Sequence, residues 1–145
     1  MNNMAVDTER VMQKIAFIKE QISDIKTLTD TADAARILND KIMIKGLKYS
    51  LQTAIESMID IAFHVAAKKY SCAPEESRDA LRVLKNNRII TNEEFEIFSS
   101  MVGFRNRMVH LYQSISNERV YEYAINKLDN FDMFINRINA LIRKP

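Results

Sequence analysis

Glycine and proline are nearly absent from this chain, and their scarcity limits the possible folds more than any other feature. The 145 residues include two glycines and two prolines, and one proline is the last residue. Tight β-turns depend on such residues, so a many-stranded protein is disfavoured and helices are expected. The length is typical of one domain, and we expect residues 1–145 to form a single all-α domain.

The spacing of apolar residues predicts an antiparallel bundle of about five helices. The first helix follows Asp7 or Thr8, and either side chain can accept backbone amides at the helix start. The second is apolar on more than one side, which predicts a central position, and it ends between Tyr70 and Pro74 because proline disfavours helical geometry in the preceding residue. The apolar positions are Val11, Ile15, Ile18, Ile22, Ile25 and Leu28 in the first helix, and Ile44, Leu47, Leu51, Ile55, Met58, Ala62 and Val65 in the second.

Three shorter helices complete the predicted bundle. Residues 75–87 form an amphipathic segment. Thr91 and Glu94 then have the spacing of a capping box, which predicts the start of a fourth helix that runs toward Arg105. The last helix is predicted to begin with Asn117 as its cap and to run as one unbroken element. Its apolar stripe consists of Val120, Ala124, Leu128, Phe131, Ile135, Ile138 and Ile142.

Composition narrows the function classes. The lone Cys72 cannot form an internal disulfide and the polar start lacks the layout of a secretory signal, so we expect a cytoplasmic protein. No apolar run approaches the ~20 residues that cross a bilayer, so no membrane association is expected. One cysteine and two distant histidines do not make a zinc site, and we expect neither a metal nor a cofactor.

The net charge of +2 is too small to indicate a polyanionic partner by itself, so any basic face must be local. Several basic residues are clustered in the sequence. They either form a local basic face that binds a polyanion or belong to an ordinary solvated helix surface. The candidates are Arg78, Arg82, Lys85 and Arg88, followed by Arg105 and Arg107.

A polar string stands where an ordinary helix end would need only a cap. On a continuing helix, Asn106 and His110 face the same way, while Arg105 and Tyr112 lie along a neighbouring line. Arginine matches a phosphate with its forked donors, and histidine transfers protons near neutral pH. Together they suit cleavage of RNA through its own 2′-hydroxyl, without a metal. The spacing alone also permits a buried core histidine, an arginine that compensates the helix dipole and a tyrosine at the rim.

Asn106 of the polar string and three further residues are candidates for substrate binding or support. Asp60 and His64 are four residues apart on the second predicted helix, so the carboxylate could hold the imidazole. The alternative is a buried structural pair or a pair on a dimer surface. Arg107 lies between the residues of the polar string, and it either adds to an RNA-binding field or faces solvent.

Three segments, taken in order, resemble the HepT-like branch of the HEPN superfamily. They are residues 59–64, 84–90 and 101–112. The most specific element is the string R-N-x-x-x-H-x-Y, whose named positions match Arg105, Asn106, His110 and Tyr112 without a gap.

The resemblance implies a metal-independent ribonuclease toxin paired with a small nucleotidyltransferase antitoxin. Arg105 and His110 would be catalytic, and Tyr112 would accept AMP groups from the antitoxin. Family members pair as two-fold dimers, which would bring two copies of the string into one cleft and would overcome the divergence of Arg105 and His110 on one regular helix. The alternative function is a non-catalytic module that binds a nucleotide or docks a nucleotidyltransferase, and a weaker one is a purely structural helical dimer.

Overall fold

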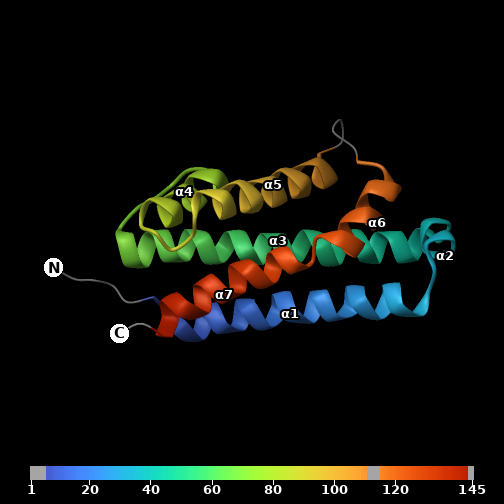
Figure 1. The fold of residues 1–145 in the computed structure, drawn as a ribbon, viewed down its shortest axis with the longest axis horizontal. Coiled ribbons are helices and arrows are strands. Elements are labelled where there is room, and N and C mark those ends of the chain that lie inside the picture. Colours follow the sequence, from blue (N-terminus) through green and yellow to red (C-terminus); the bar gives the residue numbers. More distant parts are fainter. Residues whose placement is uncertain (1–5, 111–114, 144–145) are drawn as a thin grey trace.

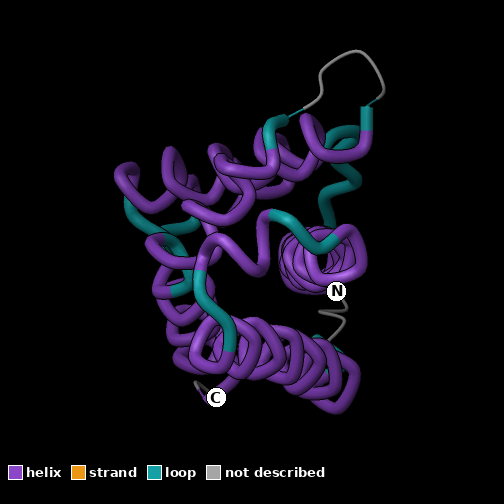
Figure 2. Tube along the Cα trace, turned by 90° about the vertical axis from the view of Figure 1, so that its right-hand side faces the viewer, coloured by secondary structure: helices purple, strands orange, loops and turns teal. Residues whose placement is uncertain are grey.

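The computed structural model describes residues 6–110 and 115–143, and all regular structure in these ranges is α-helical (Figure 2). The prediction of an all-α chain is therefore confirmed. The described residues form seven helices, compared with about five predicted. They are α1 Thr8–Thr31, α2 Ala34–Leu38, α3 Lys41–Tyr70, α4 Ser77–Asn86, α5 Asn92–Val109, α6 Asn117–Asn126 and α7 Asp129–Arg143.

The long helix α3 is the centre of the arrangement. It packs against α1, α2, α4, α5 and α6, which confirms the central position predicted from its broad apolar surface. Figure 1 shows α1 and α3 running in opposite directions, with α5 returning along the other side of α3. The C-terminal helix α7 lies across α1 and also contacts α5. The bundle is therefore built around one helix that is enclosed on several sides.

Side chains cap the helices at the predicted starts. The Asp7 carboxylate accepts the Arg10 amide at 3.1 Å, which places the first cap at Asp7 rather than Thr8. Thr91 and Glu94 form the complete capping box, each side chain accepting the other residue's backbone amide, at 3.0 and 2.9 Å. These bonds satisfy amides that have no partner within the helix, so both starts are fixed by local sequence.

Two predictions about element number were wrong. The short helix α2 was missed because five residues are too few to show a periodic pattern, and Ile37 is its one buried residue. The predicted last helix is divided into α6 and α7. Near the break, the amides of Asn130 and Phe131 donate to carbonyls three residues back rather than four, which makes a tight turn. Apolar residues on both sides of this turn still point inward, so the stripe conceals the break.

The predicted cap of the last segment was also displaced by one residue. Ser116, not Asn117, is the N-cap of α6, and its hydroxyl accepts the amide of Arg119 at 3.2 Å. Asn117 is the first helical residue.

The buried core joins helices that are distant in sequence. Phe98 of α5 and Phe134 of α7 are fully buried and meet edge to face, with ring centroids 5.3 Å apart. This geometry is favourable for aromatic pairs and fixes α5 against α7. None of the helices in residues 6–110 and 115–143 combines the length and apolar character needed to span a membrane.

Candidate functional site

Arg105 lies near the C-terminal end of α5 and is held by a carboxylate from α3. Its Nε and Nη2 donate to Oε2 of Glu56 at 3.1 and 2.7 Å. Gln52, one turn earlier on α3, donates to the same Glu56 oxygen at 3.0 Å. The Arg105 and Glu56 side chains are 29% and 34% exposed, so the ion pair lies at the edge of the bundle rather than inside it. The guanidinium is therefore fixed in orientation and still accessible to solvent.

Asn106 connects the two residues that were predicted to be catalytic. Its side-chain Oδ1 accepts Nη1 of Arg105 at 3.1 Å, and its backbone carbonyl accepts the His110 amide at 3.1 Å. A guanidinium has five N–H donors. Three of them are used by Glu56 and Asn106, so two remain for a ligand.

His110 is exposed and stands at the end of α5, not within it. The helix ends at Val109, and His110 is its C-cap with extended backbone angles, φ −88° and ψ 131°. The helical geometry considered for the polar string therefore holds only as far as Val109, although the His110 amide still donates to the Asn106 carbonyl one turn earlier. The buried-histidine alternative is also excluded by this exposure. Tyr112 lies outside the described residues.

The structure does not bring Asp60 and His64 together as an acid–imidazole pair. The Asp60 carboxylate forms an ion pair with Lys14 of α1 at 2.8 Å. His64 instead accepts the backbone amide of Asp7 on its Nε2 at 3.0 Å. Desolvation, followed by the nearby positive charges of Arg10 and Lys68, lowers the pKa of His64 despite an opposing effect of Asp7. His64 must be neutral to accept this hydrogen bond. Because Asp7 is the N-cap of α1 and His64 lies in α3, the bond connects the start of α1 to α3.

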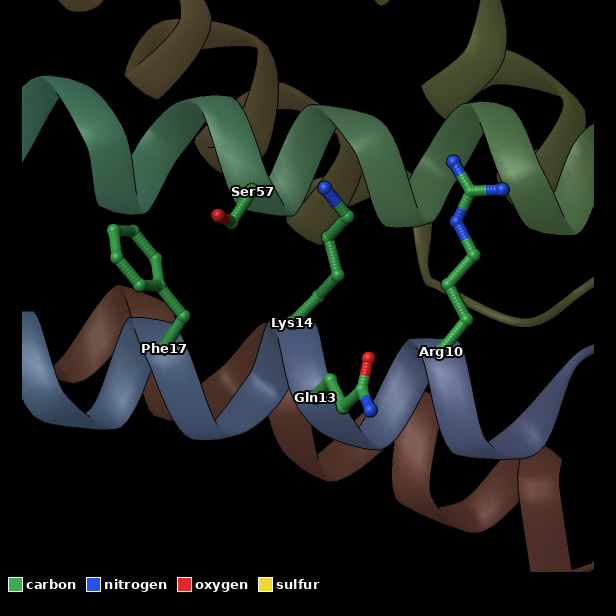
Figure 3. Close-up of a pocket in the computed structure, with 5 residues that line it drawn as sticks. All are labelled: Arg10, Gln13, Lys14, Phe17 and Ser57. Carbon is green, nitrogen blue, oxygen red and sulfur yellow. The ribbon is translucent and has the colours of Figure 1, made fainter.

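A shallow hollow of about 550 Å³ lies between α1 and α3, and Lys14 of the Lys14–Asp60 ion pair is one of the residues that line it (Figure 3). Figure 3 shows Arg10, Lys14 and Phe17 extending from α1 toward α3, where Ser57 lies. Lys14 is neutralised by Asp60, so this surface carries less free positive charge than its composition indicates.

The basic residues around α4 gather on one aromatic ring. Arg78, Arg82 and Lys85 lie 5.3, 5.4 and 4.6 Å from the centroid of Phe95. Arg82 is also paired with Asp79 at 2.6 Å, and Arg78 lies 3.7 Å from Glu96. These contacts favour the interpretation of an ordinary helix surface for this group.

Arg107 lies on a different side of α5 from Arg105. The two residues are two positions apart, which is roughly 200° around an α-helix. Arg107 is exposed and lines a separate hollow between α5 and α6.

Glu56 is the site residue that sequence reasoning missed. It is 49 residues from Arg105, so the pairing depends on how α3 meets α5. The available signal was a carboxylate within an otherwise largely apolar stretch of α3, between Ile55 and Ser57. Among the described residues, no group of three or more His, Cys, Asp or Glu side chains is placed to hold a metal ion.

These features define a small all-α protein whose candidate site is built at the C-terminal end of one helix. A family model described as "Ribonuclease HepT-like" matches residues 18–138, most of the chain, and the chain belongs to this HepT-like family.

Two kinds of relative are similar along nearly the whole length. The mRNA nuclease HepT of Shewanella oneidensis is 32% identical over 130 residues, covering 90% of this chain and 96% of the relative. A solved structure of a tri-AMPylated Shewanella oneidensis HEPN toxin in complex with an MNT antitoxin superposes with a TM-score of 0.83 at 31% identity, covering 97% of this chain and 99% of the toxin. A toxin–antitoxin structure with AMP-PNP gives a TM-score of 0.82 at 30% identity, covering 91% and 98%.

Proposed function

We propose that this protein is a cytoplasmic ribonuclease toxin that cleaves RNA without a metal ion and is neutralised by a nucleotidyltransferase antitoxin. Membership of the HepT-like family supports the class, and a relative that is 32% identical is an mRNA nuclease. The observation that carries the proposal is the end of α5, where Asn106 links an oriented Arg105 to an exposed His110.

The proposed reaction is an internal transfer at one phosphodiester. The ribose 2′-oxygen attacks phosphorus and the bond from phosphorus to the 5′-oxygen breaks, leaving a 2′,3′-cyclic phosphate and a 5′-hydroxyl. A neutral His110 takes the proton from the 2′-hydroxyl, and an imidazolium returns one to the departing 5′-oxygen. The two free donors of Arg105 stabilise the negative charge that grows on the phosphate oxygens.

We further propose that two copies of the chain form the active unit. One His110 cannot accept and donate a proton in the same step, and the structure shows no hydrogen bond between Arg105 and His110 among the described residues. A two-fold dimer duplicates both groups, so one imidazole serves as base and the other as acid.

The proposed control is AMPylation of Tyr112 by the antitoxin. An HEPN toxin with 31% identity is tri-AMPylated in complex with its MNT antitoxin. Tyr112 follows His110 by two residues, so each added phosphate would bring negative charge close to the site and repel the substrate's phosphates. Co-expression with the transferase, followed by mass spectrometry of wild type and Tyr112→Phe, tests this. An adenylate mass that persists in Tyr112→Phe removes the assignment.

The central test is incubation of purified protein with RNA in EDTA. We expect wild type to produce 2′,3′-cyclic phosphate ends, and His110→Ala and Arg105→Ala to lose at least about 100-fold in rate, as is typical for general acid–base groups. Arg36→Ala is the matched control, because Arg36 is exposed on α2, which contributes no residue to the candidate site. RNA or transferase binding without turnover in wild type would instead establish the non-catalytic binding module.

A further inference from the structure

A second hollow, of about 230 Å³, lies between α5 and α6 on the far side of α5 from the Arg105–Glu56 pair. Its walls are formed by the facing sides of α5 and α6. Phe104 and Arg107 come from α5, and Arg119 and Tyr123 come from α6. Lys127, the C-cap of α6, also lines the hollow.

The charge of this hollow is positive and only partly compensated. Arg107, Arg119 and Lys127 contribute three cations and Glu122 one carboxylate, a formal balance of 3 − 1 = +2. Within residues 6–110 and 115–143, no carboxylate lies at ion-pair distance from any of the three cations. This contrasts with Arg105, which is paired with Glu56. Converging unpaired cations attract an anion.

Aromatic rings form the inner wall of the hollow. Phe104 and Tyr123 are stacked with their ring centroids 3.9 Å apart and their planes 15° from parallel. The Tyr123 hydroxyl is buried, and the described part of the chain offers it no hydrogen-bond partner. Burial raises the pKa of this phenol, so the hydroxyl remains a donor at neutral pH. Because almost none of this hydroxyl is accessible, the ring of Tyr123 rather than its hydroxyl lines the hollow.

We propose that this hollow binds a phosphodiester group of the RNA strand other than the one that is cleaved. The inference rests on the proposed ribonuclease function and extends it to substrate binding. The volume is below the ~300–1,000 Å³ of typical sites for drug-sized ligands, which favours one phosphate of a passing strand over a whole cofactor. Arg105 and Arg107 both lie close to the C-terminal end of α5, so a strand that passes around this end would reach both sides of the helix.

The test measures binding of a short fluorescein-labelled single-stranded RNA by anisotropy, in full-length protein carrying His110→Ala so that the probe stays intact. Arg119→Ala and Lys127→Ala are compared with Arg36→Ala at several salt concentrations. We expect each hollow variant to weaken binding about tenfold, the effect of losing one charged contact. The slope of log affinity against log salt should also fall by about 0.7 per lost phosphate contact. Thermal unfolding verifies that each variant is folded.

The inference would be overturned if Arg119→Ala and Lys127→Ala both bound RNA with the affinity and salt slope of Arg36→Ala. RNA cleavage by wild type would in that case still support the proposed function. RNA that binds through the hollow but is not cut by wild type would support the inference and refute the ribonuclease. Free AMP bound there by a protein that does not bind RNA would overturn the assignment to an RNA strand.

Discussion

The ion pair between Arg105 and Glu56 allows a quantitative test of how the candidate site is held. Two hydrogen bonds join the groups, and both side chains are about one third exposed. A hydrogen bond to a charged partner contributes about 1.5–3 kcal/mol when shielded, and water competes at this exposure. We therefore expect a coupling free energy of about 1–1.5 kcal/mol. The pair between Arg82 and Asp79, at 44% and 48% exposure, should give about 0.3–0.5 kcal/mol.

The assay is a double-mutant cycle of Glu56→Ala and Arg105→Ala, measured by urea unfolding. Glu56→Ala alone should destabilise the protein by about 1.5 kcal/mol, because it leaves the guanidinium without its carboxylate. With an m-value of about 2 kcal/mol/M, the urea midpoint falls by about 0.7 M. A second cycle on Arg82 and Asp79 is the control. A coupling for Arg105 and Glu56 that is no larger than the control would show that α3 does not hold the arginine.

A different substitution of Glu56 separates the effect of its charge on catalysis from its effect on the orientation of Arg105. Glu56→Gln keeps an oxygen that can accept from Arg105 but removes the negative charge that competes with a phosphate. Under the proposed function we expect a lower KM, because the guanidinium attracts the substrate more strongly, and a lower kcat, because its orientation is less tightly fixed. An unchanged kcat and KM would contradict a positioning role for Glu56.

Three further outcomes follow from the fold. Arg88→Gly should stabilise the protein by about 1 kcal/mol in urea unfolding, because Arg88 has a φ of 61°, where glycine is unstrained; a loss of stability would contradict this. Phe98→Ala should destabilise by about 3–5 kcal/mol, since the ring is fully buried against Phe134; a change under 1 kcal/mol would mean that α5 does not depend on this contact. Burial lowers the pKa of His64, so the unfolded chain binds more protons and stability should fall as pH drops below about 6.5; His64→Gln should reduce this pH dependence, and an identical pH profile would refute the assignment.

Periodicity predicted the long helices because their stability comes from burying one apolar stripe. The spacing from Val11 to Ile25 corresponds to a continuous buried face of α1, and the broad apolar surface of α3 corresponds to its enclosure by five other helices. Local chemistry likewise predicted the capping box at Thr91, whose hydrogen bonds span three residues. Features that satisfy neighbouring backbone groups can be recognised without knowing the fold.

The end of α5 could not be predicted in the same way. Val109, His110 and Leu111 include neither glycine nor proline, so no local signal marks the stop. Glu56 was missed for a related reason, because its role depends on the packing of α3 against α5 over 49 residues of intervening chain. Resemblance identified Arg105 and His110 as candidates, whereas the orientation of the guanidinium needed coordinates.

Two kinds of positive charge lie on different sides of the C-terminal end of α5. They differ in whether a carboxylate is paired with them, and this difference bears on how the candidate site could work. On one side Arg105 is held by Glu56, so its attraction for a resting phosphodiester is reduced while its geometry is fixed. On the other side Arg107 faces a hollow with two more cations and a balance of +2. Under the proposed function and the further inference, substrate affinity and transition-state stabilisation would then come from different groups. Catalysis benefits when binding charge is separate from charge that acts in the transition state, because only the latter lowers the barrier.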